Sequence, residues 1–60
     1  MNTTFTNTEY NVAAIVTETS KGFAVSLLDC DSEEIVGTRI FPQDRYDDAL
    51  AYAKFLIQVV

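Results

Sequence analysis

Pro42 divides this chain into two parts whose apolar residues follow different periods. Before the proline, apolar and polar residues alternate, as they do in strands that bury one face. After it, apolar residues recur every three or four positions, as they do along one face of a helix. Proline has no backbone N–H to donate to a neighbouring strand, so a strand is expected to end here. The sequence therefore predicts strands first and a helix afterwards, arranged as two layers around one core.

Three stretches before the proline are predicted to be antiparallel strands. They are Tyr10 to Glu18 (YNVAAIVTE), Phe23 to Asp29 (FAVSLLD) and Ile35 to Phe41 (IVGTRIF). All three are rich in the β-branched, aromatic and small apolar residues that suit a half-buried sheet, and turn-forming residues separate them. Gly22 belongs to the turn Thr19 to Gly22, at a position where a positive φ is often required, and Gly37 indicates a bulge or a close backbone approach.

The segment before Tyr10 is rich in threonine and asparagine (MNTTFTNTE). Such residues bond locally and bury little surface, so the segment is predicted to be a mobile polar tail or an edge segment that orders late. It has no basic start and no apolar run, which argues against a signal peptide or a membrane anchor, and a cytoplasmic location is expected. We therefore expect a flexible polar tail over residues 1–9 and one domain over residues 10–60. The expected fold class is α+β, a three-stranded antiparallel sheet (β-β-β) followed by one C-terminal helix packed on one face.

The helix is predicted to run from about Asp44, as its N-cap, to about Gln58. Seven residues form an apolar stripe about 120° wide that suits packing on a sheet: Tyr46, Ala49, Leu50, Ala53, Leu56, Ile57 and Val60. Phe55 points about opposite the middle of this stripe, and Tyr52 and Val59 lie on its flank. Phe55 is either an ordinary exposed aromatic residue, a residue returned to the core by fraying of the last turn, or part of a protein interface. The interface is favoured, because aromatic residues are enriched at contact surfaces.

The alternation also assigns the two faces of the sheet. If Phe23, Val25 and Leu27 face the helix, the other face carries Ile15, Ala24 and Leu28 and is partly apolar. An uncovered face and an edge strand are both surfaces that a partner can use.

The charge of the chain limits its partners. Among 60 residues, nine are acidic and four are Lys or Arg, which gives a net charge of -5. This charge repels phosphate backbones and anionic membranes, so neither nucleic acid nor membrane is an expected partner. Arg39 and Arg45 are expected to pair with neighbouring carboxylates, Arg45 with Asp48 for instance. Four acidic residues near the second turn form either a solvated hairpin tip or a docking patch for a basic partner: Asp29, Asp31, Glu33 and Glu34.

The residue types that carry catalysis or bind cofactors are scarce in this chain. There is no histidine, Cys30 is the single cysteine, and the two glycines do not form a phosphate-binding loop. The acidic stretch resembles the start of a calcium loop, but it lacks the glycine of the sharp turn and the closing glutamate. We therefore expect no catalytic residues, no metal site, no cofactor and no enzymatic activity.

The third strand and the helix, VGTRIFPQDRYDDALAYAKFLI, resemble those of small acidic phage and mobile-element proteins of anti-CRISPR type. The features that carry this resemblance are the strand with Val36, Gly37, Arg39 and Phe41 and the helix after it. It implies a non-enzymatic inhibitor that binds a CRISPR effector subunit. A second similarity is to HicB-type antitoxins, through the order of strands and the Asp48-Ala49 pair. Their Pro-Gly turn after the Asp of the second strand is absent here, and we expect no DNA-binding segment after the helix.

The function expected from the sequence is that of a small protein-binding inhibitor of phage or mobile-element origin, which occludes a basic surface of a host defence protein. The candidate contact residues are apolar ones on the helix and acidic ones that steer the partner. They are Tyr52, Phe55 and Val59, with Asp48, Asp29, Asp31, Glu33 and Glu34. The alternative is a structural or regulatory homodimer, antitoxin-like, that hides the same helix face against a second copy.

Overall fold

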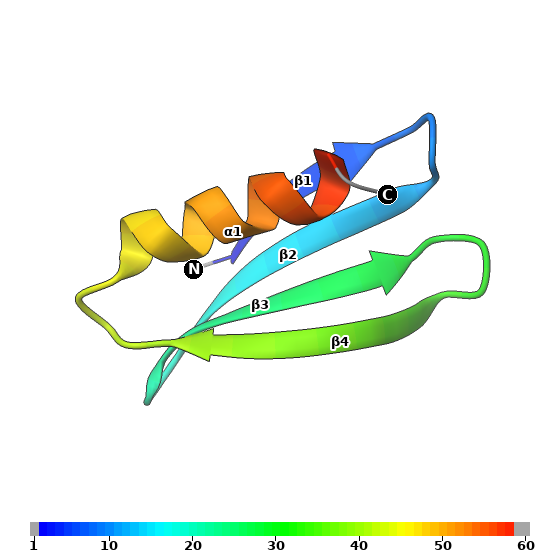
Figure 1. Cartoon of the computed structure of the whole chain (residues 1–60). Coiled ribbons are helices and arrows are strands. Elements are labelled where there is room, and N and C mark those ends of the chain that lie inside the picture. The colour runs from blue at the N-terminus through cyan, green and yellow to red at the C-terminus, as the bar shows by residue number, and fades with distance from the viewer. Residues whose placement is uncertain (1, 59–60) are drawn as a thin grey trace.

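The computed structural model describes residues 2–58, which form an antiparallel sheet of four strands with one helix on one face. The elements are β1 (Asn2–Asn7), β2 (Val12–Thr19), β3 (Gly22–Asp29), β4 (Glu34–Phe41) and α1 (Tyr46–Gln58). The strands lie in the sheet in the same order as in the sequence, so each pairs with the next through a hairpin (Figure 1). The predicted α+β class, with an antiparallel sheet followed by a C-terminal helix, is confirmed.

The prediction of three strands is wrong, because Asn2–Asn7 forms a fourth. This segment, which we expected to be a polar tail or a late-ordering edge segment, pairs with β2 along its whole length. Its threonines are β-branched and suit a strand, and alternate residues face the helix. Phe5 lies opposite Ala14 and packs against the core from that side. One apolar side chain in an otherwise polar segment therefore anchors the edge of the sheet.

The turn between β2 and β3 depends on a glycine. Thr19 pairs with Gly22, and the Thr19 hydroxyl accepts a hydrogen bond from the Lys21 N–H at 3.2 Å. Gly22 has a φ of 142°, and a Cβ at this position would lie 2.0 Å from the carbonyl oxygen of Phe41. Only glycine fits both the backbone conformation and the contact with the end of β4. The sequence-based prediction for Gly22 is confirmed.

A β-bulge interrupts the pairing of β3 with β4. Ile35 pairs with Leu28 and Gly37 pairs with Leu27, so Val36 is an extra residue between them. A Cβ at Gly37 would have no atom within 4 Å. Of the two roles predicted for Gly37, the bulge is confirmed and the close backbone approach is wrong.

The core lies where α1 crosses β2 and β3. Ala49 and Ala53, one helical turn apart, are fully buried, as is Ala14 on β2. Val16 and Val25 complete the contact from the sheet with 2% and 1% of their surface exposed. Partly buried residues surround this core: Phe5, Phe41, Tyr46, Leu50, Tyr52, Leu56 and Ile57. The predicted inner stripe of the helix is confirmed, apart from Val60, which lies outside the described residues.

The N-terminus of α1 is held by a turn that follows Pro42. The Arg45 N–H donates to the Pro42 carbonyl and the Ala49 N–H donates to the Arg45 carbonyl, each at 3.0 Å. The N-cap position therefore falls on Arg45, one residue after the predicted Asp44. The helix has 13 residues, and within residues 2–58 no helix has the length and apolar character needed to cross a membrane.

Near its C-terminus, α1 is tied to the turn between β1 and β2. The Asn7 Nδ2 donates to the Ile57 carbonyl at 2.6 Å, which satisfies one of the carbonyls that a helix end leaves free. The Asn7 Oδ1 accepts hydrogen bonds from the N–H groups of Glu9 and Tyr10 at 3.0 and 3.2 Å. One side chain thus shapes the turn and joins it to the helix.

We expect Gly22→Ala to lower the free energy of unfolding by at least about 2 kcal/mol, since the new Cβ meets a backbone oxygen at a positive φ. Gly37→Ala is the matched control, because space is open at that position, and it should change stability by less than about 1 kcal/mol. Urea unfolding followed by circular dichroism measures both values. Equal effects of the two substitutions would contradict the assigned contact at Gly22.

We expect Asn7→Ala to destabilise the fold by about 1–2 kcal/mol, because it leaves the Ile57 carbonyl without its partly buried donor. Asn7→Asp keeps the acceptor for the turn and loses only the donor to the helix. If the hydrogen bond to the helix accounts for most of the effect, Asn7→Asp should lower the free energy of unfolding by about as much as Asn7→Ala. Urea unfolding of both variants separates the two roles, and wild-type stability of Asn7→Asp would assign the effect to the turn alone.

Candidate protein-binding surface

Large exposed apolar side chains lie on β4 and on α1. Ile35, Val36 and Ile40 on β4 are 54%, 67% and 56% exposed, and Phe55 on α1 is 54% exposed. Tyr10, also 54% exposed, lies apart in the turn between β1 and β2. Single exposed apolar residues are common in monomers, but three on the outer strand β4 make that strand a candidate contact surface, and Phe55 is a second candidate on α1.

A groove runs between α1 and the two strands β3 and β4, and of these exposed residues Val36 lines it. The helix lies mainly over β2 and β3, reaches β1, and contacts β4 least, so that β4 projects beyond it (Figure 1). The groove has a volume of about 230 Å³. Most of its lining is apolar: Val25, Leu27, Val36, Gly37, Thr38, Arg39, Tyr52 and Leu56. It has room for a large side chain from another molecule.

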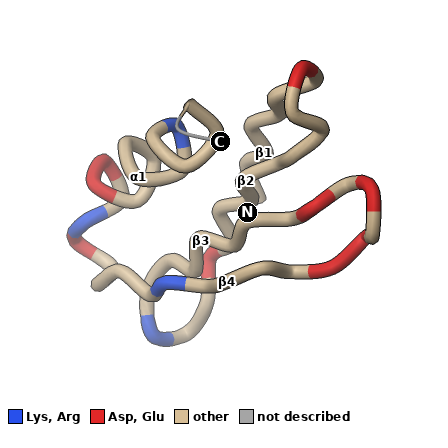
Figure 2. Tube along the Cα trace, turned by 45° about the vertical axis from the view of Figure 1, so that its right-hand side comes forward, with Lys and Arg blue, Asp and Glu red and all other residues tan. Residues whose placement is uncertain are grey.

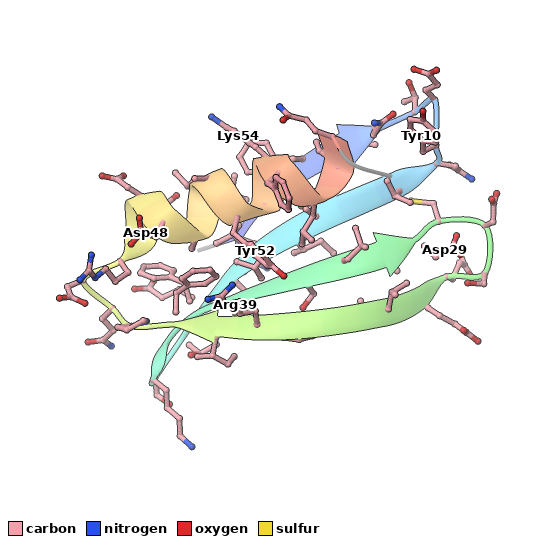
Figure 3. The ribbon with its side chains drawn as sticks, in the orientation of Figure 1. Tyr10, Asp29, Arg39, Asp48, Tyr52 and Lys54 are labelled. Atoms are coloured by element: carbon pink, nitrogen blue, oxygen red, sulfur yellow. The ribbon has the colours of Figure 1, made fainter. Side chains whose placement is uncertain are left out.

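Arg39 is the only charged residue that lines this groove within the described part of the chain. Its guanidinium lies 5.0 Å from the ring centroids of both Phe41 and Tyr52. Figure 3 labels Arg39 and Tyr52. These two rings contact each other with centroids 5.5 Å apart. The stacking orders the guanidinium without using its N–H donors.

The two arginines therefore differ from each other. Arg45 forms the predicted pair with Asp48 at 3.5 Å, but both side chains are more than half exposed, so the pair contributes little stability. The expectation of a carboxylate partner for Arg39 is wrong, since no Asp or Glu in residues 2–58 forms an ion pair with it. Arg39 presents a positive charge that has no ionic partner among these residues.

The predicted helix contact lies on one flank of α1. Asp48, Tyr52 and Phe55 follow one another at helical spacing, and Tyr52 packs on Phe41 of β4. Tyr52 is half-buried, whereas Asp48 and Phe55 are exposed. Val59 lies outside the described residues. Of the described residues on this flank, Tyr52 lines the groove beside β4.

The four acidic residues named above lie around the turn between β3 and β4. The Asp29 carboxylate accepts a hydrogen bond from the Asp31 N–H at 3.0 Å, and Asn11 Nδ2 donates to Asp31. Glu33 has a positive φ of 59° and, like Glu34, is exposed. The acidic residues are at the end of the sheet away from Asp48, as the labelled Asp29 and Asp48 in Figure 3 and the colours of Figure 2 show. The structure does not bring the acidic turn together with the helix flank.

No group of three or more His, Cys, Asp or Glu side chains that could hold a metal ion occurs in residues 2–58. The acidic turn is instead arranged by hydrogen bonds to its own backbone and to Asn11. Asp31, Glu33 and Glu34 at this turn are exposed and carry negative charge.

The second face of the sheet is uncovered by any described element. Ile15 lies opposite Ser26, on the same face as Ala24 and Leu28, as predicted from alternation. The Ser26 and Thr38 hydroxyls are 3.1 Å apart on this face. Ile40 pairs with Ala24 and therefore continues the apolar part toward β4. The sequence analysis did not identify Ile40, Val36 or Arg39 as contact residues. The signal that could have indicated them is their position in the third predicted strand, which also contains Gly37.

We expect Phe55→Asp to change the free energy of unfolding by less than about 1 kcal/mol, because the side chain is 54% exposed. Leu56→Asp, at the adjacent position, should cost more than about 2 kcal/mol, since Leu56 packs against the core. Thermal and urea unfolding of both variants measure the difference. A large loss of stability in Phe55→Asp would place that ring in the core and remove it from the contact surface.

Comparison with known proteins found no family model, no curated protein and no solved structure that matches this chain. The resemblances to anti-CRISPR proteins and to HicB-type antitoxins therefore stay predictions. The surface features that suggest a function are the groove, the exposed ring of Phe55 and the uncovered edge of β4.

Proposed function

We propose that this chain is a small non-enzymatic protein-binding module that acts by occluding a surface of its partner. The observation that carries the proposal is the ring of Phe55, which is 54% exposed on α1, about one helical turn from Tyr52, and Tyr52 lines an apolar groove. An aromatic side chain next to a concave apolar surface is the usual composition of an interaction centre. Val36, which lines this groove, continues the apolar surface onto β4, and Ile40 continues it onto the uncovered face of the sheet.

The size of the domain supports a role in occlusion. The chain has an accessible surface of 4013 Å². A standard interface buries about 800 Å² on each partner, so one contact would take about a fifth of this surface. The side formed by β4 and the α1 flank is the apolar region that such a contact would cover. A substrate cleft of the kind that enzymes use would need more chain than this domain has beside its core.

The acidic turn supplies the electrostatic part of the proposal. Asp31, Glu33 and Glu34 are exposed at one end of the sheet, and the chain carries a net charge of -5. Clustered charge of one sign increases the rate of association with a surface of opposite sign. A partner with a basic surface around its contact region is therefore favoured. The resemblance to anti-CRISPR proteins suggests one class with such surfaces, the CRISPR effector subunits.

A homodimer is the second candidate, because the same exposed apolar side could be hidden against a second copy. Size-exclusion chromatography with light scattering separates the two. A monodisperse dimer at micromolar concentration favours the second candidate, and a monomer that captures a different protein favours the first.

We expect Phe55→Asp to abolish capture of the partner by the tagged chain, since a carboxylate in the contact centre is left unpaired on binding. Thr8→Asp is the matched control: it adds the same charge at an exposed turn position on the β1–β2 side and should leave capture unchanged. Affinity capture with a purified CRISPR effector subunit, and with lysate of the source cells, provides the measurement. Retained capture by Phe55→Asp, with unchanged stability, would contradict the proposal.

A further inference from the structure

The outer edge of β4 offers a place where a strand of another protein can pair. β4 is the last strand of the sheet, so its backbone groups on the side away from β3 have no strand partner in the described part of the chain. The bulge at Val36 divides this edge into an irregular part and a regular part from Gly37 to Phe41. Only the regular part keeps the backbone geometry that a pairing strand requires.

The side chains of this regular part have fixed directions. Gly37 and Arg39 lie opposite Leu27 and Val25 and therefore face the helix and the groove. Thr38 and Ile40 lie opposite Ser26 and Ala24 and face the uncovered side of the sheet. A strand added beside β4 would place its own side chains on the same two faces in alternation.

Two positions of the edge specify which side chains the added strand should carry. At Arg39 the guanidinium is ordered by the rings of Phe41 and Tyr52 and has no ionic partner among residues 2–58. At Gly37 nothing lies within 4 Å of the Cβ position, and the groove next to it is lined by Leu27, Val36 and Leu56 among others. The first position fits a carboxylate and the second fits a large apolar side chain.

We propose that β4 binds an extended segment of a protein partner as an antiparallel fifth strand, with an acidic residue opposite Arg39 and a large apolar residue opposite Gly37. Because the added strand runs in the opposite direction to β4, the acidic residue comes first and the apolar residue follows two positions later. The residue before the acidic one lies opposite Ile40, which is 56% exposed, and is also apolar. The recognised pattern is therefore apolar, acidic, any residue, apolar. Main-chain hydrogen bonds supply affinity and the two sites supply specificity.

This inference rests on the proposed function in that it takes the partner to be a protein. It concerns the β4 edge, however, and does not depend on Phe55. The partner's segment that pairs with this edge has one acidic residue. The rest of the partner's contact surface faces the acidic turn of this chain and is basic. If no strand pairs with β4, the proposed function still stands, with the exposed flank of α1 as the contact with the partner.

The test uses the full chain labelled with ¹⁵N and the peptide acetyl-Thr-Val-Glu-Thr-Leu-Thr-amide, followed by NMR titration. We expect saturable shifts concentrated in the amides of residues 37–41. Replacing the peptide's Glu by Gln, or Arg39→Gln in the protein, should weaken binding about two- to fivefold. Replacing the peptide's Leu by Ser should weaken it about tenfold.

Two protein variants make the test specific. Gly37→Leu fills the space that the peptide's leucine would occupy and should abolish binding, whereas Gly37→Ala should retain it. Arg39→Glu should bind the peptide that has Lys in place of Glu better than the original peptide. No saturable shifts, shifts at β1 instead of β4, or binding that ignores both Arg39 and the peptide's Glu would each overturn the inference.

Discussion

The fold depends on the close approach of one helix to the sheet through alanines. Ala49 and Ala53 on α1 and Ala14 on β2 are fully buried, and such small side chains let the helix backbone come near the strands. A helix of 13 residues is only marginally stable alone, so its stability comes from this contact. The described residues contain no buried polar side chain that would add a requirement for internal hydrogen bonds. Burial of apolar surface at this crossing is therefore the main term that holds the two layers together.

The same contact determines what stays uncovered. A helix with its side chains is about 10–12 Å across, while neighbouring strands are about 4.8 Å apart, so one helix covers about two strands fully. In a sheet of four strands, a helix centred on β2 and β3 cannot also cover the outer strand β4. The groove beside Tyr52 and the exposure of β4 follow from this geometry. The proposed binding surface thus exists because one helix is too narrow to cover a sheet of four strands.

The sequence predicted the parts of the fold that have a clear period. Alternation located β2, β3 and β4 within a few residues, and the helical stripe located α1 and its inner face. β1 was missed because the Asn/Thr composition of residues 2–7 is typical of a tail, although Phe5 among alternating threonines was a strand signal. The exposed direction of Phe55 was also predictable, since a helical wheel needs only spacing. The groove and the stacking of Arg39 were not predictable, because both depend on where α1 lies relative to β4. That position is set by the tertiary packing of the alanines and by no local pattern.

The bulge at Val36 also affects how copies of this chain meet at high concentration. Fibre growth by edge-to-edge addition requires segments of about six or seven residues that pair in continuous register. The extra residue in β4 leaves an uninterrupted stretch only from Gly37 to Phe41, which is shorter than that. The apolar edge of β4 can therefore pair in register only with a short strand, which does not favour the growth of a fibre. The extra residue at Val36 therefore limits the length of β4 edge along which a second strand could pair in continuous register.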